Sequence, residues 1–262
     1  MIVSSIYYYG EGLMMSGTNQ TRFFQYKVVW GIIGLAYIVV WILPFIGNFS
    51  GQANGSAESL AVLRDYSRYQ WYVIALFGLV SFAYAKEVEK KNWSAVFAGL
   101  TFVFVNLFNE LWNGLIFTFT GGYSAYWMLG YPSAYNPLIG WCVEIICCFL
   151  LFGLVITKGI PEDKNKKFFG FLNNRIVIAF AWATTAVVLE MILNSFGALI
   201  WNYWWWSTRF PFFLLILAYF PFALAAYFVY DMNDTKKQAW FTGILGGTLT
   251  VAYVVLTLTG LV

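Results

Sequence analysis

Long apolar segments, separated by short polar ones, follow one another along nearly the whole chain of 262 residues. Most are about 20 residues long, which is the length that an α-helix needs to cross the hydrocarbon core of a bilayer. They occupy residues 28–46, 70–85, 94–118, 137–157, 175–200, 210–230 and 239–260. The pattern predicts an all-α, polytopic membrane protein: a seven-transmembrane-helix bundle that forms one domain over residues 24–262.

The segments that precede the first two spans differ in character. Residues 1–23 are expected to form an N-terminal tail, for which disorder is a candidate state. This tail lacks the basic start and the small-residue cleavage site of a signal peptide, and Met14 and Met15 are alternative starts. Segment 58–70 places apolar residues on one side of a helix and charged residues on the other, which predicts a helix in the membrane interface.

Lysine and arginine are concentrated in the connections on one side of the membrane. The connection between the fourth and fifth spans alone carries Lys158, Lys164, Lys166, Lys167 and Arg175. Because cytoplasmic loops are enriched in these residues, the N-terminus is predicted to be cytoplasmic and the C-terminus outside. Only Arg64, Arg68 and Arg209 then lie on the outer side. We expect a multi-pass protein integral to the cell (plasma) membrane.

Two of the outer connections, residues 121–136 and 201–209, are rich in tyrosine and tryptophan. Trp201, Trp204, Trp205 and Trp206 all lie within six residues. Aromatic residues at a membrane interface commonly anchor a protein in the headgroup region. Such a density of tryptophan exceeds what anchoring requires, so two interpretations stay open: an anchoring belt and the lined mouth of a cavity.

Three glutamates, Glu110, Glu144 and Glu190, interrupt apolar spans. An ionisable residue near the bilayer centre costs roughly 2.5–3.5 kcal/mol on insertion scales, so each is a candidate functional residue. Glu110 and Glu190 lie about 16 and 15 residues into outward-running spans, and Glu144 about 7 residues from the outer end of an inward-running span, so at 1.5 Å per residue their depths are similar. The three acids are therefore predicted to converge in the outer half of the membrane.

Asparagines accompany two of these acids at helical spacing. Asn106 and Asn113 share a face with Glu110, and Asn194 lies one turn beyond Glu190. Polar stripes of this kind face the interior of a bundle, and the carboxyl groups of Glu110 and Glu190 are expected within about 10 Å of each other, where they would couple. The alternative is an interhelical hydrogen-bond cluster that only holds the helices together. The residues expected to contact a substrate are Asn106, Asn113, Asn194, Trp112, Trp141, Trp201, Trp205 and Arg209.

The composition excludes several classes of site. The chain has no histidine, which removes histidine-ligated haem, copper and zinc. Cys142, Cys147 and Cys148 are interpreted as small buried hydrophobes, and no metal or cofactor is expected. The last span has no lysine for retinal, no span carries an acidic pair for magnesium diphosphate, and no Gly-rich phosphate loop is present. The glycines of the last span, Gly243, Gly246 and Gly247, predict close helix packing.

One stretch resembles a known family. Asn106-Leu-Phe-Asn-Glu110-Leu is similar to the Asn-x-x-Trp-Glu-Phe segment of the fungal integral-membrane meroterpenoid (terpene) cyclases, and Trp205-Trp206-Ser-Thr-Arg209 resembles their Trp-rich stretch ending in Arg. The resemblance implies a seven-helix enzyme that protonates a polyprenyl epoxide or alkene. Asn109 departs from the family's Trp. No Asp in a late span matches the family's second acid, because Asp231 falls at the cytoplasmic end of the sixth span.

The resulting hypothesis is an integral membrane enzyme, of the cyclase, isomerase or lyase type, that acts on a lipophilic, isoprenoid-like substrate. Glu110 is expected to donate the proton, with Glu190 and Glu144 as base or as tuning groups. The alternatives are a proton- or cation-coupled transporter or channel and a non-catalytic subunit of a larger membrane complex. The expected partners are membrane lipids and a lipophilic small molecule, with no nucleic acid, while a membrane-protein partner and a homo-oligomer stay open.

Overall fold

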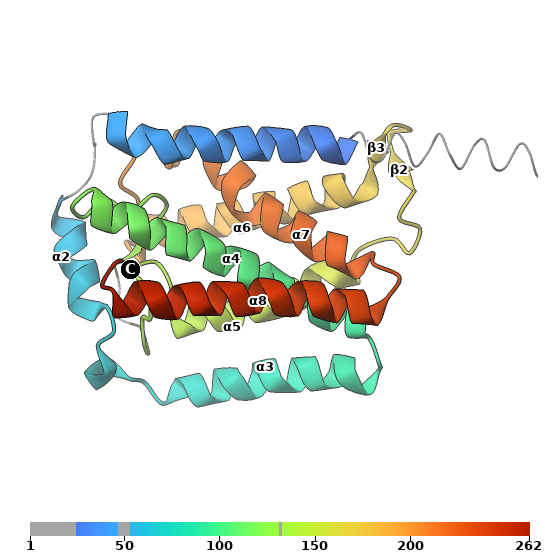
Figure 1. The fold of residues 1–262 in the computed structure, drawn as a ribbon, viewed down its shortest axis with the longest axis horizontal. Helices are drawn as coiled ribbons and strands as arrows, with labels where there is room; N and C mark the ends of the chain where they lie inside the picture. Colours follow the sequence, from blue (N-terminus) through green and yellow to red (C-terminus); the bar gives the residue numbers. More distant parts are fainter. Residues whose placement is uncertain (1–24, 47–52, 131–132) are drawn as a thin grey trace, which may run out of the picture.

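The computed structural model describes residues 25–46, 53–130 and 133–262, so the predicted tail over residues 1–23 lies outside the described part. Long helices run side by side along the longest axis of the molecule (Figure 1). They are Gln25–Ile46, α3 (Tyr72–Glu89), α4 (Trp93–Phe119), α5 (Val143–Lys158), α6 (Asn174–Ser195), α7 (Phe220–Tyr230) and α8 (Thr235–Leu258). A π-helix, Leu214–Tyr219, leads directly into α7.

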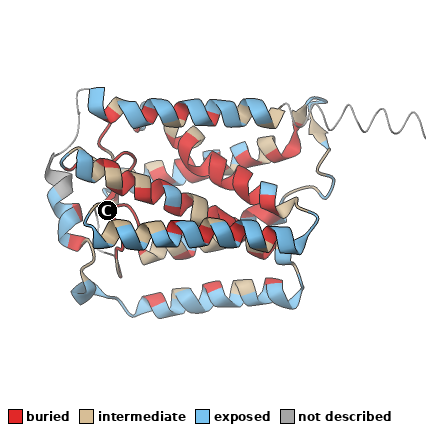
Figure 2. Ribbon diagram, viewed as in Figure 1, coloured by how far each residue is buried: buried red, intermediate tan, exposed pale blue. Residues whose placement is uncertain are grey.

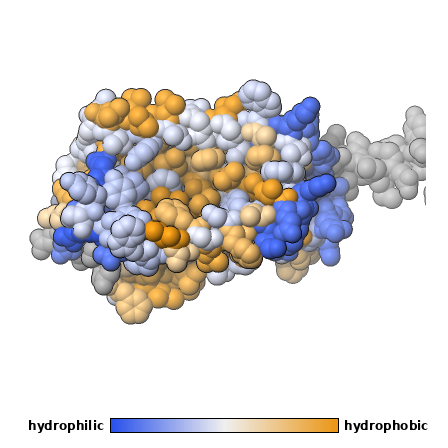
Figure 3. All heavy atoms as spheres, turned by 90° about the horizontal axis from the view of Figure 1, so that it is seen from below, coloured by the Kyte–Doolittle hydropathy of each residue, from blue (hydrophilic) through white to orange (hydrophobic). Residues whose placement is uncertain are grey.

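Four of these helices are long and apolar enough to cross a membrane: Gln25–Ile46, α4, α6 and α8. In the most apolar 18-residue stretch of α4, 67% of the residues are buried, against 17% in that of α8. The helix α4 therefore lies at the centre of the bundle (Figure 2). Apolar atoms cover the middle of the face in Figure 3, and hydrophilic atoms gather at the end that carries the short strands β2 (Lys167–Phe168) and β3 (Leu172–Asn173). The helical membrane fold is confirmed, while seven crossings and the orientation stay predictions.

Small residues allow the neighbours of α4 to approach closely. A Cβ atom on Gly153 of α5 would lie 2.8 Å from the carbonyl oxygen of Gly99, so the two backbones are in direct contact. A Cβ atom on Gly246 of α8 would meet the ring of Phe104. Close packing of this kind is how membrane helices associate without a hydrophobic driving force. Gly243 and Gly247 have open space around them, so the packing prediction holds for Gly246 alone.

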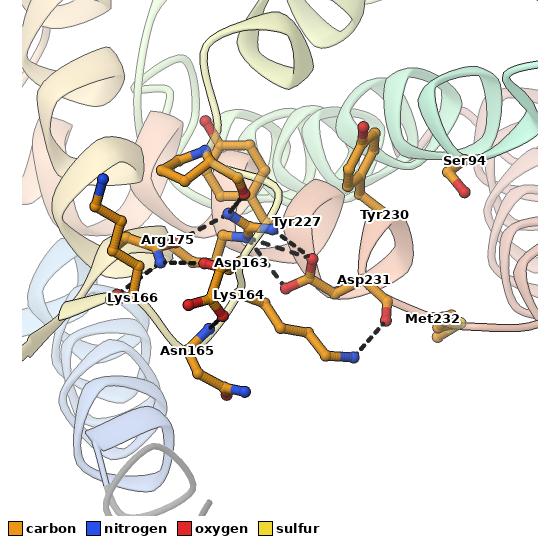
Figure 4. Close-up of polar contacts among 12 residues, drawn as sticks. Ser94, Asp163, Lys164, Asn165, Lys166, Arg175, Tyr227, Tyr230, Asp231 and Met232 are labelled. Carbon is orange, nitrogen blue, oxygen red and sulfur yellow. Dashed lines mark hydrogen bonds and ion pairs between the residues drawn. The ribbon is translucent and has the colours of Figure 1, made fainter. Parts of the chain in front are cut away.

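A buried ion pair joins the helices at the end that is predicted to be cytoplasmic, which we call the inner end. The side chain of Arg175, in the first turn of α6, is 1% exposed and lies 2.8 Å from Asp231 just beyond α7 (Figure 4). Arg175 Nη1 also donates to the carbonyl oxygen of Pro161, at 2.7 Å, in the loop after α5. In the same loop β2 (Lys167–Phe168) pairs with β3 (Leu172–Asn173). Arg175 thus ties α6 to the end of α7 and to the loop after α5. Asp231 lies just beyond α7, at the end of the sixth predicted span.

The opposite, outer end is closed by a second small sheet. β1 (Met128–Leu129), which follows α4, pairs antiparallel with β4 (Leu199–Ile200), which follows α6. The short helix α2 (Ala53–Val62) lies beside this sheet, and Ser59 Oγ donates to the Leu129 carbonyl oxygen at 2.8 Å. The interfacial helix predicted over residues 58–70 is wrong in its bounds, because Arg64 takes a φ of 55° and breaks the helix.

Removing the carboxylate of Asp231 tests the inner ion pair. In Asp231→Ala the guanidinium of Arg175 stays buried without its partner, and breaking a buried pair in this way costs roughly 3–5 kcal/mol. We expect a clearly lower midpoint of thermal unfolding in detergent. Glu89→Ala, which removes an exposed partner of Lys86, is the matched control and should change the midpoint little. Equal midpoints for the two variants would contradict a stabilising role for the Arg175–Asp231 pair.

Candidate functional site

The structure brings two of the three predicted acids together. Glu110, on α4, is 0% exposed, and Glu190, on α6, is 1% exposed. Their carboxyl groups lie close enough to interact electrostatically. Contact between the helices allows this, because α6 packs against α7 and the π-helix, and α7 packs against α4. Two buried ionisable groups therefore lie within electrostatic range of each other, and a shared functional site stays a prediction.

Glu110 lies in a pocket of polar groups that leaves its hydrogen-bonding capacity unused. Within the described residues, neither of its carboxyl oxygens has a hydrogen-bond partner of good geometry, and neither does the Asn106 amide. Asn106 and Asn113 are its polar neighbours. Gly140 closes the pocket, since a Cβ atom there would lie 2.6 Å from Glu110 Oε2. Unsatisfied buried groups are uncommon in native proteins and point to a functional constraint.

Glu190 is held by aromatic side chains from the outer half of the molecule. Trp201 Nε1 donates a hydrogen bond to Glu190 Oε1 at 3.3 Å. The side chains of Tyr219 and Trp206 also lie against this carboxyl group. A buried carboxyl group is costly unless donors surround it, so these residues explain how α6 accommodates an acid there.

The π-helix Leu214–Tyr219 positions Tyr219, and its cause is visible in the sequence. Pro221 has no N–H, so it cannot bond to the carbonyl oxygen of Leu217 four residues earlier. Asn109 Nδ2 donates to that oxygen at 2.7 Å, and the Tyr37 hydroxyl lies 2.9 Å from it and 2.7 Å from Asn109 Oδ1. Single π-helical turns are frequent at functional sites. Asn109 thus supports the π-helix from α4.

The aromatic loops form a packed cap over the two acids. Tyr126, Trp127, Trp205 and Trp206 are all 2% exposed or less, and only Trp204 of the tryptophan cluster reaches 57%. The rings of Tyr126 and Trp206 are 4.5 Å apart, and Trp127 Nε1 donates to the Gly140 carbonyl oxygen at 2.8 Å. Buried rings cannot anchor in lipid headgroups, so the cavity interpretation of these loops fits better than the belt.

Two asparagines hold this cap rather than the acids. Asn113 Nδ2 donates to the Trp127 carbonyl oxygen at 2.6 Å, and its Oδ1 accepts from the Tyr126 N–H at 2.7 Å. Asn194 Nδ2 donates to the Leu199 carbonyl oxygen at 2.8 Å. Each asparagine thus ties the outer end of its helix to the strand, or the start of the strand, that follows it.

Glu144 does not lie at the depth that the sequence predicted. Residues Leu138 and Trp141 form a tight turn, so α5 begins at Val143 and not at residue 137. Glu144 is therefore in the first turn of α5, where a carboxylate is favoured by the helix dipole. Its Oε1 accepts hydrogen bonds from the Ala134 N–H at 2.8 Å and from the Tyr72 hydroxyl. The expectation that the three acids lie at one depth is wrong for Glu144. Glu110 and Glu190 remain as the candidates for a shared site.

The other predicted substrate-contacting residues are dispersed. Trp112 stacks on Trp41 of the first helix, with ring centroids 4.4 Å apart, and Trp141 is buried among apolar residues of α4 and α8. Trp205 stacks on Tyr203 at 4.2 Å. Arg209 is exposed and, like Trp201, lines a polar cavity at the outer end. Of this group, only Trp201 is hydrogen-bonded to one of the two acids.

An apolar cavity of about 280 Å³ lies between α5 and α6. Leu189 and Leu193 line it and are 55% and 47% exposed on the outer surface of α6, and the exposed Cys148 lines it from α5. These exposed apolar side chains lie on a helix that is long and apolar enough to span a membrane, so in a bilayer we expect the cavity to open toward lipid. Glu190 and Tyr219 form part of its wall. Glu110 is not among its lining residues. The sequence did not predict a role for Tyr219, and only the nearby Pro221, which interrupts the helix, could have pointed to it.

Comparison with known proteins identifies the family. Residues 53–258 match an uncharacterized membrane protein family, and the chain belongs to it. A similar protein of Archaeoglobus fulgidus, described as an uncharacterized protein, is 48% identical over 182 residues, which are 70% of this chain and 85% of that protein. No solved structure matches the chain. Neither match names an activity or links the chain to the terpene cyclases.

The contact between Gly140 and Glu110 can be tested by adding one methyl group. In Gly140→Ala the new Cβ would lie within 2.8 Å of Glu110 Oε2, Asn113 Nδ2 and the Trp127 carbonyl oxygen. Overpacking of this kind typically costs about 1–3 kcal/mol, so the thermal midpoint should fall. Gly159→Ala has open space around it and is the control. If both variants unfold at the same temperature, Gly140 does not pack on the acid.

Proposed function

We propose that this member of the uncharacterized membrane protein family is an integral, multi-pass enzyme of the plasma membrane that acts on a lipophilic, isoprenoid-like substrate by acid–base chemistry. The observation that supports this best is the apolar cavity between α5 and α6, which has exposed leucines and the buried Glu190 in its wall. Its volume of about 280 Å³ is near the lower end of small-molecule sites.

The position of the cavity favours a substrate that arrives from the bilayer. Leu189 and Leu193 border its opening, and Phe149 and Phe152 of α5 line the opposite side. An apolar chain that enters between these side chains stays in an apolar environment throughout. A water-soluble substrate would lose its hydration on this route with few polar groups to replace it.

Glu190 is better placed than Glu110 to exchange a proton with such a substrate. It lines the cavity, while Glu110 lies behind it and is covered by Gly140. The carboxyl groups of Glu110 and Glu190 lie within electrostatic range of each other, so a charge on Glu110 would act on Glu190. In this assignment Glu190 is the catalytic residue and Glu110 tunes it, which reverses the roles that the sequence suggested. Tyr219 positions the Glu190 carboxyl group.

Protonation of a carbon–carbon double bond or an epoxide fits this arrangement. The Glu190 proton would add to the substrate, a carbocation would form, and the loss of a different proton to a carboxylate would end the reaction without a redox change. Aromatic faces stabilise a cation, and those of Trp127, Phe149 and Tyr219 line the cavity. The resemblance of residues 106–111 to the meroterpenoid cyclases suggests the same class of chemistry, although with Glu110 as the proton donor.

Proton- or cation-coupled transport is the second candidate. Polar cavities lie at both ends of α6: one of about 700 Å³ beside Asn194 and one of about 400 Å³ beside Arg175 and Asp231. Buried acids between two polar cavities are a feature of ion pathways. The lipid-facing cavity beside Glu190 has no role in that account, and for this reason we rank the enzyme first.

The variant Glu190→Gln separates these functions. We expect wild-type protein in nanodiscs to convert a component of a membrane lipid extract, followed by mass spectrometry. Glu190→Gln should lower this turnover by a hundredfold or more at an unchanged unfolding temperature, because a positioned acid–base group contributes roughly 10²–10⁴. The exposed Glu89→Gln is the matched control.

Two outcomes would contradict the enzyme. One is a lipid extract left unchanged by wild-type protein, and the other is full turnover in Glu190→Gln. Proton flux into wild-type liposomes that Glu190→Gln abolishes, with no lipid converted, would establish the transport function in its place.

A further inference from the structure

The outer polar cavity adjoins the lipid-facing cavity at Glu190. The outer cavity has a volume of about 700 Å³ and is lined by residues of the segment from Asn194 to Arg209. Leu199 lines both cavities. Trp201 lines the outer one and donates a hydrogen bond to Glu190, which lines the other. The side chains around the Glu190 carboxyl group therefore form the wall that separates the polar outer cavity from the apolar cavity between α5 and α6.

A hydrogen-bond donor without a partner lines the outer cavity. Asn202 is 1% exposed, and its Oδ1 accepts from the Ser124 N–H at 3.1 Å, which fixes the orientation of the amide. Asn202 Nδ2 then has no acceptor within the described part of the chain, and Asn202 belongs to the wall of the outer cavity. Trp206, whose side chain lies against the Glu190 carboxyl group, belongs to the same wall. An acceptor bound in this cavity would satisfy the Asn202 amide, which is otherwise costly to bury.

Arg209 adds the charge that selects the ligand. Of the three outer arginines, Arg68 is paired with Asp65 at 2.9 Å, and Arg64 donates to the Val262 carbonyl oxygen at 2.9 Å. Arg209 has no carboxylate within ion-pair distance among the described residues and lies at the outer cavity. The wall of this cavity contains no Asp or Glu. A guanidinium with amide, indole and hydroxyl groups is a typical environment for an oxyanion such as phosphate.

We propose that the substrate is an amphipathic lipid with an anionic, phosphate-type headgroup. The headgroup binds in the outer cavity beside Arg209, Asn202 and Trp206, and the isoprenoid-like chain lies between α5 and α6. This inference rests on the proposed function and deepens it. The carbon atoms that follow the headgroup then lie against Glu190, so the reaction occurs at that end of the chain.

Binding of two matched probes tests the headgroup. Farnesyl phosphate and farnesol have the same chain and differ in charge, and their affinities for the protein in nanodiscs can be compared by quenching of tryptophan fluorescence. Wild-type protein should prefer farnesyl phosphate by about tenfold or more, and Arg209→Gln should remove that preference, as expected for the loss of a charge-assisted contact. Arg209→Lys should retain part of it, and Arg68→Gln should retain all of it.

Competition with inorganic phosphate distinguishes a lipid headgroup from a free anion. If inorganic phosphate at the concentration of the lipid displaces it fully, the site binds the free anion and the lipid inference is overturned. Equal affinity for the two farnesyl compounds, or an unchanged preference in Arg209→Gln, also overturns it. These outcomes are independent of turnover: loss of activity in Glu190→Gln with an unchanged preference in Arg209→Gln leaves the enzyme in place and removes only the headgroup.

Discussion

The two carboxyl groups of Glu110 and Glu190 lie in an interior where bulk water cannot offset the cost of burying them. Much of the outer half of the molecule is arranged around that constraint. Trp201 and Tyr219 approach Glu190 from the outer loop and the π-helix, and Gly140 approaches Glu110 from the loop before α5. A membrane helix that needed only to span would have no use for these contacts.

Buried backbone groups are subject to the same constraint, and irregular backbone is tolerated inside the bundle only where these groups find partners. The carbonyl oxygen of Leu217, which Pro221 leaves without its helical donor, accepts hydrogen bonds from Asn109 and Tyr37 on two other helices. Non-helical backbone within a membrane requires protein partners of this kind. The carbonyl group freed by Pro221 therefore connects the first helix, α4 and the π-helix. The π-helix in turn places the Tyr219 side chain beside Glu190.

Much of this arrangement could be predicted from local patterns. Apolar length predicted the positions of the long helices, and helical spacing predicted that Glu110 and Glu190 face the interior. The start of α5 could not be predicted in this way, because a turn between Leu138 and Trp141 interrupts an apolar segment that reads as continuous. For the same reason the predicted depth of Glu144 was wrong. The partners Tyr37, Asn109 and Tyr219 come together only through tertiary packing, which no spacing along the chain reveals.

The burial of the tryptophan cluster follows the same principle. Trp205 and Trp206 look like interface anchors in sequence, yet β1 and β4 join their loop to the loop after α4 and close it into a cap. Cap and cavity together surround Glu190, and the apolar cavity lies between α5 and α6. We propose that a lipid chain reaches the buried acid from the bilayer through this cavity.

Photo-crosslinking of a lipid chain tests that claim most directly. An isoprenoid with a diazirine at the end of its chain would be activated in a bilayer that contains the protein, and the labelled peptides would be identified by mass spectrometry. Tyr219 is 7% exposed and Phe149 is partly buried, so bulk lipid has little access to them, and a chain in the cavity should label both. Label confined to lipid-exposed residues such as Ile244 of α8, which is 61% exposed, would contradict the account.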